Sequence, residues 1–175
     1  ENRIGEENMG WTYAKVLLTH ERTNIAGVAN SKIRLGELKD KASHTSNGGP
    51  MMSESPSWNQ KIADVEIELL ALEYTELRTL AAVSTGNAPG PESSILKIKG
   101  TEIQQTIDEL NVELAGYYGL PFIPEQYDAD YNDIMIGSGQ DVSSNPRYFN
   151  NRKATIYGGS NEVQTNIISK AVLGL

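Results

Sequence analysis

Apolar residues recur at spacings of three, four and seven along most of the chain, which is the pattern of helices that bury one face. The pattern predicts long helices at about residues 10–41, 57–85, 92–116 and 160–173, and a shorter helix at about 146–154. No stretch of convincing length alternates apolar with polar residues as a half-buried strand would. Long helices joined by short loops predict an all-α fold, an antiparallel four-helix-type bundle.

The predicted core consists of the apolar stripes of these helices. The residues expected to be buried are Trp11, Val16, Leu17, Ile25, Val28, Leu35, Leu38, Ile62, Val65, Leu69, Leu72, Leu77, Leu80, Ile95, Ile98, Ile107, Leu110, Leu114, Val163, Ile167, Ile168 and Val172. Loops are expected at residues 43–56 and 86–91, where glycine, proline and serine are frequent. A long irregular segment, rich in tyrosine, proline and aspartate, is expected at about 117–144, and a loop of this length is usually functional or packed over a neighbour.

Composition changes this picture mainly by exclusion. The 175 residues suit one compact domain, and a net charge of −8 disfavours nucleic acid and anionic membranes as partners. The chain has no cysteine and only two histidines, so no disulfide, thiol nucleophile or metal site is predicted. No apolar run approaches the roughly 20 residues of a membrane-spanning helix, and no secretory signal is visible, so a cytoplasmic protein is expected.

Two glycines near the end of the chain directly precede the last predicted helix. The segment reads Ile156-Tyr157-Gly158-Gly159-Ser160-Asn161-Glu162-Val163-Gln164. The glycines permit close approach of the backbone to a bound group, and Ser160 is a suitable N-cap for the helix. Free N–H groups at such a helix start can meet an acceptor. From the pattern alone, the segment is a turn followed by a helix.

This segment resembles the Tyr-(Glu/Gly)-Gly-(Thr/Ser)-Asn-Glu-(Ile/Val)-Gln segment of the acyl-CoA dehydrogenase family, whose loop lies against the flavin and the acyl thioester. The resemblance implies FAD as the cofactor, with Gly159, Ser160 and Glu162 in cofactor binding. It implies that Tyr157 and Gly158 bind the substrate, an acyl-CoA. The reaction implied is α,β-dehydrogenation to the trans-2-enoyl-CoA.

Glu21 and Arg22 in the first predicted helix are the next candidates. Taken alone, the two residues are typical of a solvated ion-pair face. The resemblance implies more, because the catalytic Glu of most family members stands where this chain has Gly158. A minority of the family, including the isovaleryl and long-chain enzymes, carries its base early in this helix, in a setting that Thr19-His20-Glu21-Arg22-Thr23 matches. Glu21 is therefore the expected catalytic base.

Arg22 corresponds to a family arginine near the active-site entrance, which implies substrate binding. An ion pair of Arg22 with Glu21 or Glu162 is an equally open alternative. The chemistry itself requires a base within hydrogen-bond reach of the proton α to the thioester, and donors that polarise the carbonyl.

The chain also departs from the family pattern. It lacks the usual Arg-x-x-Phe-Gly after the first helix and the Gln-x-x-Gly-Gly after the third. Lys39 or Lys41 could replace the missing arginine at the flavin pyrophosphate. The missing arginine motif and the polar stretch at 100–105 resemble a subgroup that includes the large subunit of pimeloyl-CoA dehydrogenase.

The resemblance implies that residues 1–10 leave a middle β-domain and that residues 11–175 form the C-terminal helical domain of a protein about twice this length. It implies an electron-transfer flavoprotein as electron acceptor and a homo-oligomer, dimer or tetramer, with a hetero-oligomer also open. Composition and spacing leave one alternative in place, a non-catalytic helical assembly subunit or interaction module whose stripes are only core.

Overall fold

The computed structural model describes residues 2–46, 48–87, 90–137 and 139–175, apart from the side chains of residues 18–25, 139 and 140. Within these ranges all regular elements are helical, and one isolated bridge pairs Ser46 with Met51. The predicted all-α fold is thereby confirmed.

Six α-helices and several short turns make up the chain over these ranges. The helices are α1 (Gly10–Ile25), α2 (Val28–Ala42), α3 (Pro56–Ser84), α4 (Glu92–Ala115), α5 (Gly139–Asn151) and α6 (Asn161–Ile168). Short 3-10 turns occupy Met52–Glu54, Gly116–Gly119, Pro124–Tyr127 and Arg152–Thr155, and a π-helical turn, Ser169–Leu173, follows α6.

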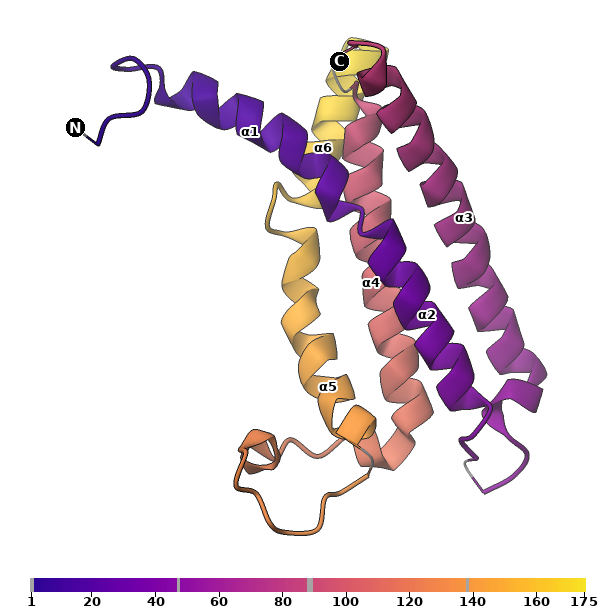
Figure 1. The fold of residues 1–175 in the computed structure, drawn as a ribbon. Helices are drawn as coiled ribbons and strands as arrows, with labels where there is room; N and C mark the ends of the chain where they lie inside the picture. The colour runs from indigo at the N-terminus through magenta and orange to yellow at the C-terminus, as the bar shows by residue number, and fades with distance from the viewer. Residues whose placement is uncertain (1, 47, 88–89, 138) are drawn as a thin grey trace.

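The helices form an antiparallel bundle around α4. In Figure 1 the chain descends along α2, rises along α3, descends along α4 and rises again through α5 and α6. Helix α4 contacts each of the other five α-helices. Because other helices cover α4 on several sides, it buries polar as well as apolar residues. These buried polar residues contact the segments described in the next subsection.

Most of the predicted core positions in α2, α3 and α4 are buried. They are Val28, Leu35, Leu38, Ile62, Val65, Leu69, Leu72, Ile107, Leu110 and Leu114. Trp58, Leu96 and Ile103 join them without having been predicted. These predicted apolar stripes are confirmed, because each of the three helices keeps one face against a neighbour over several turns.

The predicted first helix is wrong in one respect, since it is two helices. Gly27 adopts a left-handed conformation with φ 60°, which ends α1 and starts α2 in a new direction. Figure 1 shows α1 extending away from the bundle toward the N-terminus. Trp11, Val16 and Leu17 are therefore 70%, 55% and 70% exposed, and their predicted burial is wrong. The side chain of Ile25 lies outside the described residues.

Other predicted core residues also face solvent. Leu77, Leu80 and Ile95 are exposed, and so are Val163 and Val172 near the end of the chain. In α3, Thr79 lies on the buried face instead. Successive residues of a helix are rotated by about 100°, so Leu77 and Leu80 point away from that face. Apolar residues thus lie on two opposite faces of α3, only one of which meets the bundle.

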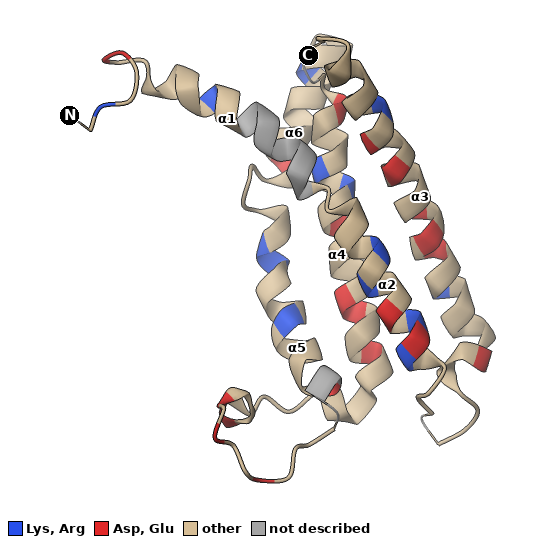
Figure 2. Ribbon diagram, viewed as in Figure 1, with Lys and Arg blue, Asp and Glu red and all other residues tan. Residues whose placement is uncertain are grey.

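The segment between α4 and α5 is joined to α5 by hydrogen bonds, one of them from Asn145 Nδ2 to the Leu120 carbonyl at 3.2 Å. Tyr127 donates a hydrogen bond from its hydroxyl to the carbonyl of Val142 at 2.8 Å. Figure 2 shows acidic residues and no basic ones on this segment, in contrast to the mixed charges of α2. Helix α5 begins at Gly139, earlier than the predicted short helix, and includes Pro146.

Candidate functional site

The Gly-Gly loop enters α6 through a capped turn. Gly158 and Gly159 both have positive φ values, 65° and 87°, which other residues rarely adopt. Ser160 is the N-cap of α6, and its Oγ accepts a hydrogen bond from the backbone N–H of Val163 at 3.4 Å. The N-cap expected from the sequence is confirmed.

Gln164 supports this loop from inside the bundle. Its side chain is buried, and its Nε2 donates to the carbonyl of Gly158 at 3.2 Å. A Cβ on Gly159 would lie 2.5 Å from the same Nε2, so another residue here would displace the Gln164 side chain and would also have to adopt the positive φ. Gln164 therefore packs inside the bundle and supports the loop.

Lys97 of α4 lies beneath the start of α6. It is fully buried, and its Nζ donates to Oδ1 of Asn161 at 3.0 Å. Burial away from water lowers the pKa of Lys97, and the carboxylate of Glu162 partly offsets this effect. The pKa of Glu162 is lowered, first by a hydrogen bond from Ser160, then by its own backbone N–H and by the charge of Lys97.

Lys97 is not among the residues predicted from the sequence, although its spacing gives a signal. Lys97, Thr101 and Asp108 are spaced four and seven residues apart, so they form one polar line along α4. All three are buried, which places this line against other helices instead of solvent. Such a polar line beside an apolar stripe indicates a buried hydrogen-bonding face.

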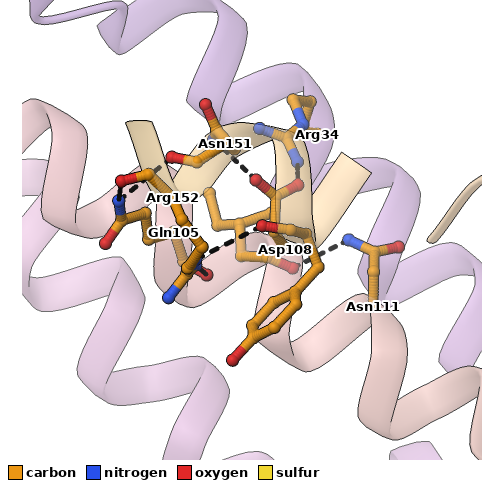
Figure 3. Close-up of polar contacts among 8 residues, drawn as sticks. Arg34, Gln105, Asp108, Asn111, Asn151 and Arg152 are labelled. Atoms are coloured by element: carbon orange, nitrogen blue, oxygen red, sulfur yellow. Dashed lines mark hydrogen bonds and ion pairs between the residues drawn. The ribbon is translucent and has the colours of Figure 1, made fainter. Parts of the chain in front are cut away.

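A second polar cluster fixes the chain just before the Gly-Gly loop. Figure 3 shows Arg34 and Asn151 pointing toward the carboxylate of Asp108. Arg34 forms an ion pair with Asp108, and Asn151 Nδ2 donates to Asp108 Oδ2 at 2.6 Å. Beside them, Gln105 Nε2 donates to the carbonyls of Asn151 and Arg152 at 3.0 and 3.3 Å, and Arg152 Nη2 returns a bond to the Gln105 carbonyl at 3.2 Å. Helix α4 therefore binds the chain both before the Gly-Gly loop, at Asn151 and Arg152, and after it, at Asn161.

The end of α1 packs on the same part of α4. A Cβ on Gly100 would lie 2.5 Å from the carbonyl oxygen of Ala26, so the two backbones are in close contact. Gly100 is three residues from Lys97, which contacts the start of α6. The helix that carries Glu21 and the start of α6, which follows the Gly-Gly loop, thus meet the same stretch of α4, although the Glu21 and Arg22 side chains lie outside the described residues.

The remaining candidates differ in exposure. Tyr157 and Glu162 are exposed, and Gly158, Gly159 and Ser160 are partly buried. The exposed edge of the loop fits the uncharged part of a flavin or thioester better than its phosphates, because the charged side chain of the loop is the carboxylate of Glu162. Lys39 and Lys41, the candidates for the pyrophosphate, form ion pairs with Glu66 at 2.6 Å and Asp141 at 2.5 Å.

Other kinds of site find no support in the part of the chain that the structure describes. There, no group of three or more His, Asp or Glu residues could hold a metal ion. The helices, searched over the same residues, include none long and apolar enough to cross a membrane.

The helical architecture of this chain also occurs in solved structures of acyl-CoA dehydrogenases. The butyryl-CoA dehydrogenase of Megasphaera elsdenii shares the fold with a TM-score of 0.72 and 20% identity, over 97% of this chain and 40% of that one. The family model of the acyl-CoA dehydrogenase C-terminal domain matches residues 8–173. The chain therefore belongs to the acyl-CoA dehydrogenase family, as the resemblance predicted.

Two mycobacterial proteins are similar over nearly the whole chain. Acyl-CoA dehydrogenase FadE26 of Mycobacterium tuberculosis is 28% identical over 182 residues, which cover 99% of this chain and 42% of that protein. A chain of the ChsE4–ChsE5 complex of the same organism is 26% identical with a TM-score of 0.74, over 99% of this chain and 43% of that one. The chain thus spans about two fifths of the length of these relatives. The subgroup resemblance to pimeloyl-CoA dehydrogenase stays a prediction.

Proposed function

We propose that this chain is the C-terminal helical domain of an FAD-dependent acyl-CoA dehydrogenase that converts an acyl-CoA to its trans-2-enoyl-CoA. The observation that carries the proposal is that the end of α1 and the start of α6, which directly follows the Gly-Gly loop, pack on the same stretch of α4, around Lys97 and Gly100. This stretch brings together the two segments that the family resemblance assigns to the reaction. Membership of the family supports the same conclusion.

Glu21 is the proposed base, because Gly158 has no side chain to take a proton. A base at Glu21 would remove the proton α to the thioester, with Arg22 and Tyr157 positioning the acyl-CoA at the entrance. Bound FAD would supply the acceptor for the hydride that leaves the β-carbon. Gly158, Gly159 and Ser160 would form the edge of the flavin and thioester site, with Glu162 oriented by the Ser160 hydroxyl.

The test uses the natural protein that carries this domain, loaded with FAD. Bleaching of the flavin by acyl-CoA substrates without oxygen would report the reductive half-reaction. Glu21→Gln is expected to keep the flavin and to slow bleaching by about 10²–10⁴-fold, the usual contribution of a general base. Glu37→Gln, an exposed glutamate of α2, is the matched control and is expected to leave the rate unchanged. Retained bleaching in Glu21→Gln would refute Glu21 as the base.

A role in assembly is the second candidate, and one observation favours it. The outer face of α3 carries exposed apolar residues spaced three and four apart, namely Ile67, Leu70, Tyr74, Leu77 and Leu80. Such a stripe fits a neighbouring helix.

We propose that the protein is an oligomer, homo-oligomeric or hetero-oligomeric, that works in the cytoplasm. As a dehydrogenase it would pass its electrons to an electron-transfer flavoprotein.

The two candidates predict different properties of the purified natural protein. A yellow protein whose flavin spectrum bleaches with an acyl-CoA supports the dehydrogenase. A colourless protein that binds a partner subunit through α3 supports a non-catalytic assembly subunit.

A further inference from the structure

Lys97 is the largest fully buried side chain of the described residues, and it ends in an ionisable amine. Burying an ammonium group is unfavourable unless other polar groups replace its water. In the part of the chain that the structure describes, the hydrogen bond of Lys97 goes to a neutral group, Oδ1 of Asn161. Asp108, the other fully buried charge on the polar line of α4, is neutralised by Arg34. Among the described residues, the hydrogen bond of Lys97 therefore ties α4 to the first residue of α6.

The contacts of the Lys97 side chain with the described residues concern the start of α6. Asn161 is the first residue of α6 and follows Ser160, the N-cap. Glu162, which acts on the charge of Lys97, is the next residue. One turn later Gln164 returns to the loop and binds the carbonyl of Gly158. By fixing Asn161, Lys97 fixes the start of α6. Gln164 of the same helix then fixes the Gly-Gly loop through the Gly158 carbonyl.

We propose that Lys97 is a positioning residue of the dehydrogenation site, which fixes the Gly158–Ser160 loop through Asn161. The proposal rests on the proposed function, because the loop must meet the flavin and the thioester for its position to matter. In this proposal Lys97 contacts neither the flavin nor the thioester, and it acts only through α6. A misplacement of about 1 Å at a reacting centre can cost on the order of 10² in rate, so a small shift of α6 is enough.

The experiment is a double-mutant cycle on the flavin-loaded natural protein. Lys97→Met removes the donor while keeping the shape of the stem, and Asn161→Leu removes the acceptor. Each is expected to lower kcat about 10- to 100-fold, with a smaller change in KM and with FAD retained. The double variant is expected to lose no more than either single one, because both remove the same contact.

Two further variants separate positioning from general stability. Asn161→Asp keeps an acceptor for Lys97 and is expected to restore kcat close to that of the wild type. Lys99→Met, at an exposed lysine paired with Glu102 at 3.0 Å, is the control and should leave kcat unchanged. If Lys97→Met does not fold, the comparison of Asn161→Leu with Asn161→Asp tests the same contact from the other side.

The outcomes distinguish the two proposals. Wild-type kcat in Asn161→Leu, or losses that simply add in the double variant, would overturn the role of Lys97 while leaving the dehydrogenase intact. A lowered unfolding midpoint with unchanged kcat would overturn it as well, since the contact would then be merely structural. A wild-type protein that no acyl-CoA can bleach would refute the proposed function itself.

Discussion

Arg34 of α2 and Asp108 of α4 form an ion pair across the bundle, although 74 residues separate them in the sequence. The side chain of Asp108 is completely buried and that of Arg34 is 11% exposed. Asn151 at the end of α5 donates to the second carboxylate oxygen, so three helices meet at one buried group (Figure 3). The ion pair therefore joins α2 to α4, and through Asn151 it also fixes the end of α5, from which the chain leads into the Gly-Gly loop.

Asp108→Asn is expected to lower the free energy of unfolding by about 3 kcal/mol, because it leaves the guanidinium of Arg34 buried without a counter-charge. Urea denaturation of the chain, followed by helical circular dichroism, measures this change. Glu113→Gln is the control, since Glu113 pairs with Lys61 at 2.6 Å on the surface and should contribute less than about 1 kcal/mol. Equal effects of the two variants would contradict the assigned importance of burial.

Gly100→Ala and Gly36→Ala are expected to have opposite effects on stability. Replacing a helical glycine with alanine usually stabilises by about 0.5–1 kcal/mol, and Gly36 has open space around its Cβ position. At Gly100 the new methyl would press on the backbone of Ala26, which is expected to cost about 1–3 kcal/mol. Urea midpoints of both variants test this, and stabilisation by Gly100→Ala would show that α1 does not pack there.

Ser160→Ala is expected to raise the pKa of Glu162 toward its ordinary value of 4.5, because the hydrogen bond from Ser160 is the first cause of the lowered pKa. A carboxyl with a lowered pKa in the folded state adds stability above its unfolded pKa and loses it as the pH falls through the folded pKa. The variant should therefore show a weaker loss of stability in acid. Carbon NMR of the Glu162 carboxyl against pH measures the shift directly.

Ser55→Ala is the matched control for this prediction. Ser55 caps α3 by accepting from the backbone N–H of Trp58 at 3.4 Å, and it lies far along the chain from Glu162. Both variants should lose about 1 kcal/mol of stability as N-cap replacements. Only Ser160→Ala should change the titration of Glu162, and an unchanged titration would contradict the assigned hydrogen bond.

Leu70→Glu together with Leu77→Glu is expected to split the natural assembly into smaller species, because both residues lie on the exposed apolar stripe of α3. A charge placed in a buried interface leaves an unpaired, desolvated group. Light scattering after size-exclusion chromatography measures the mass. Ile33→Glu, at an equally exposed apolar residue of α2, is the control, and an unchanged mass in the α3 variant would exclude this stripe as an interface.

Local rules account for what could be predicted of the fold. The end of α3 at Ser84, before Gly86, and the cap of α6 at Ser160 follow from residues within one turn of each boundary. The break at Gly27 was missed, because a glycine inside a periodic pattern does not reveal whether the helix continues through it. The burial of Thr79 in place of Leu77 was missed because hydrophobicity does not show which of two apolar faces meets a neighbour.

By itself, the sequence determined most of the helices, the all-α class and the loop that enters the last helix, since periodicity, glycine and capping chemistry act over a few residues. The family followed from the resemblance of that loop and was confirmed by the family model. Only the tertiary structure decided that Lys97 lies beneath Asn161 and that Asp108 meets Arg34, over separations of 64 and 74 residues. The cost or benefit of a buried charge depends on which groups the other helices bring to it. No local pattern contains that information, so the support of the candidate site emerged only from the packing around α4.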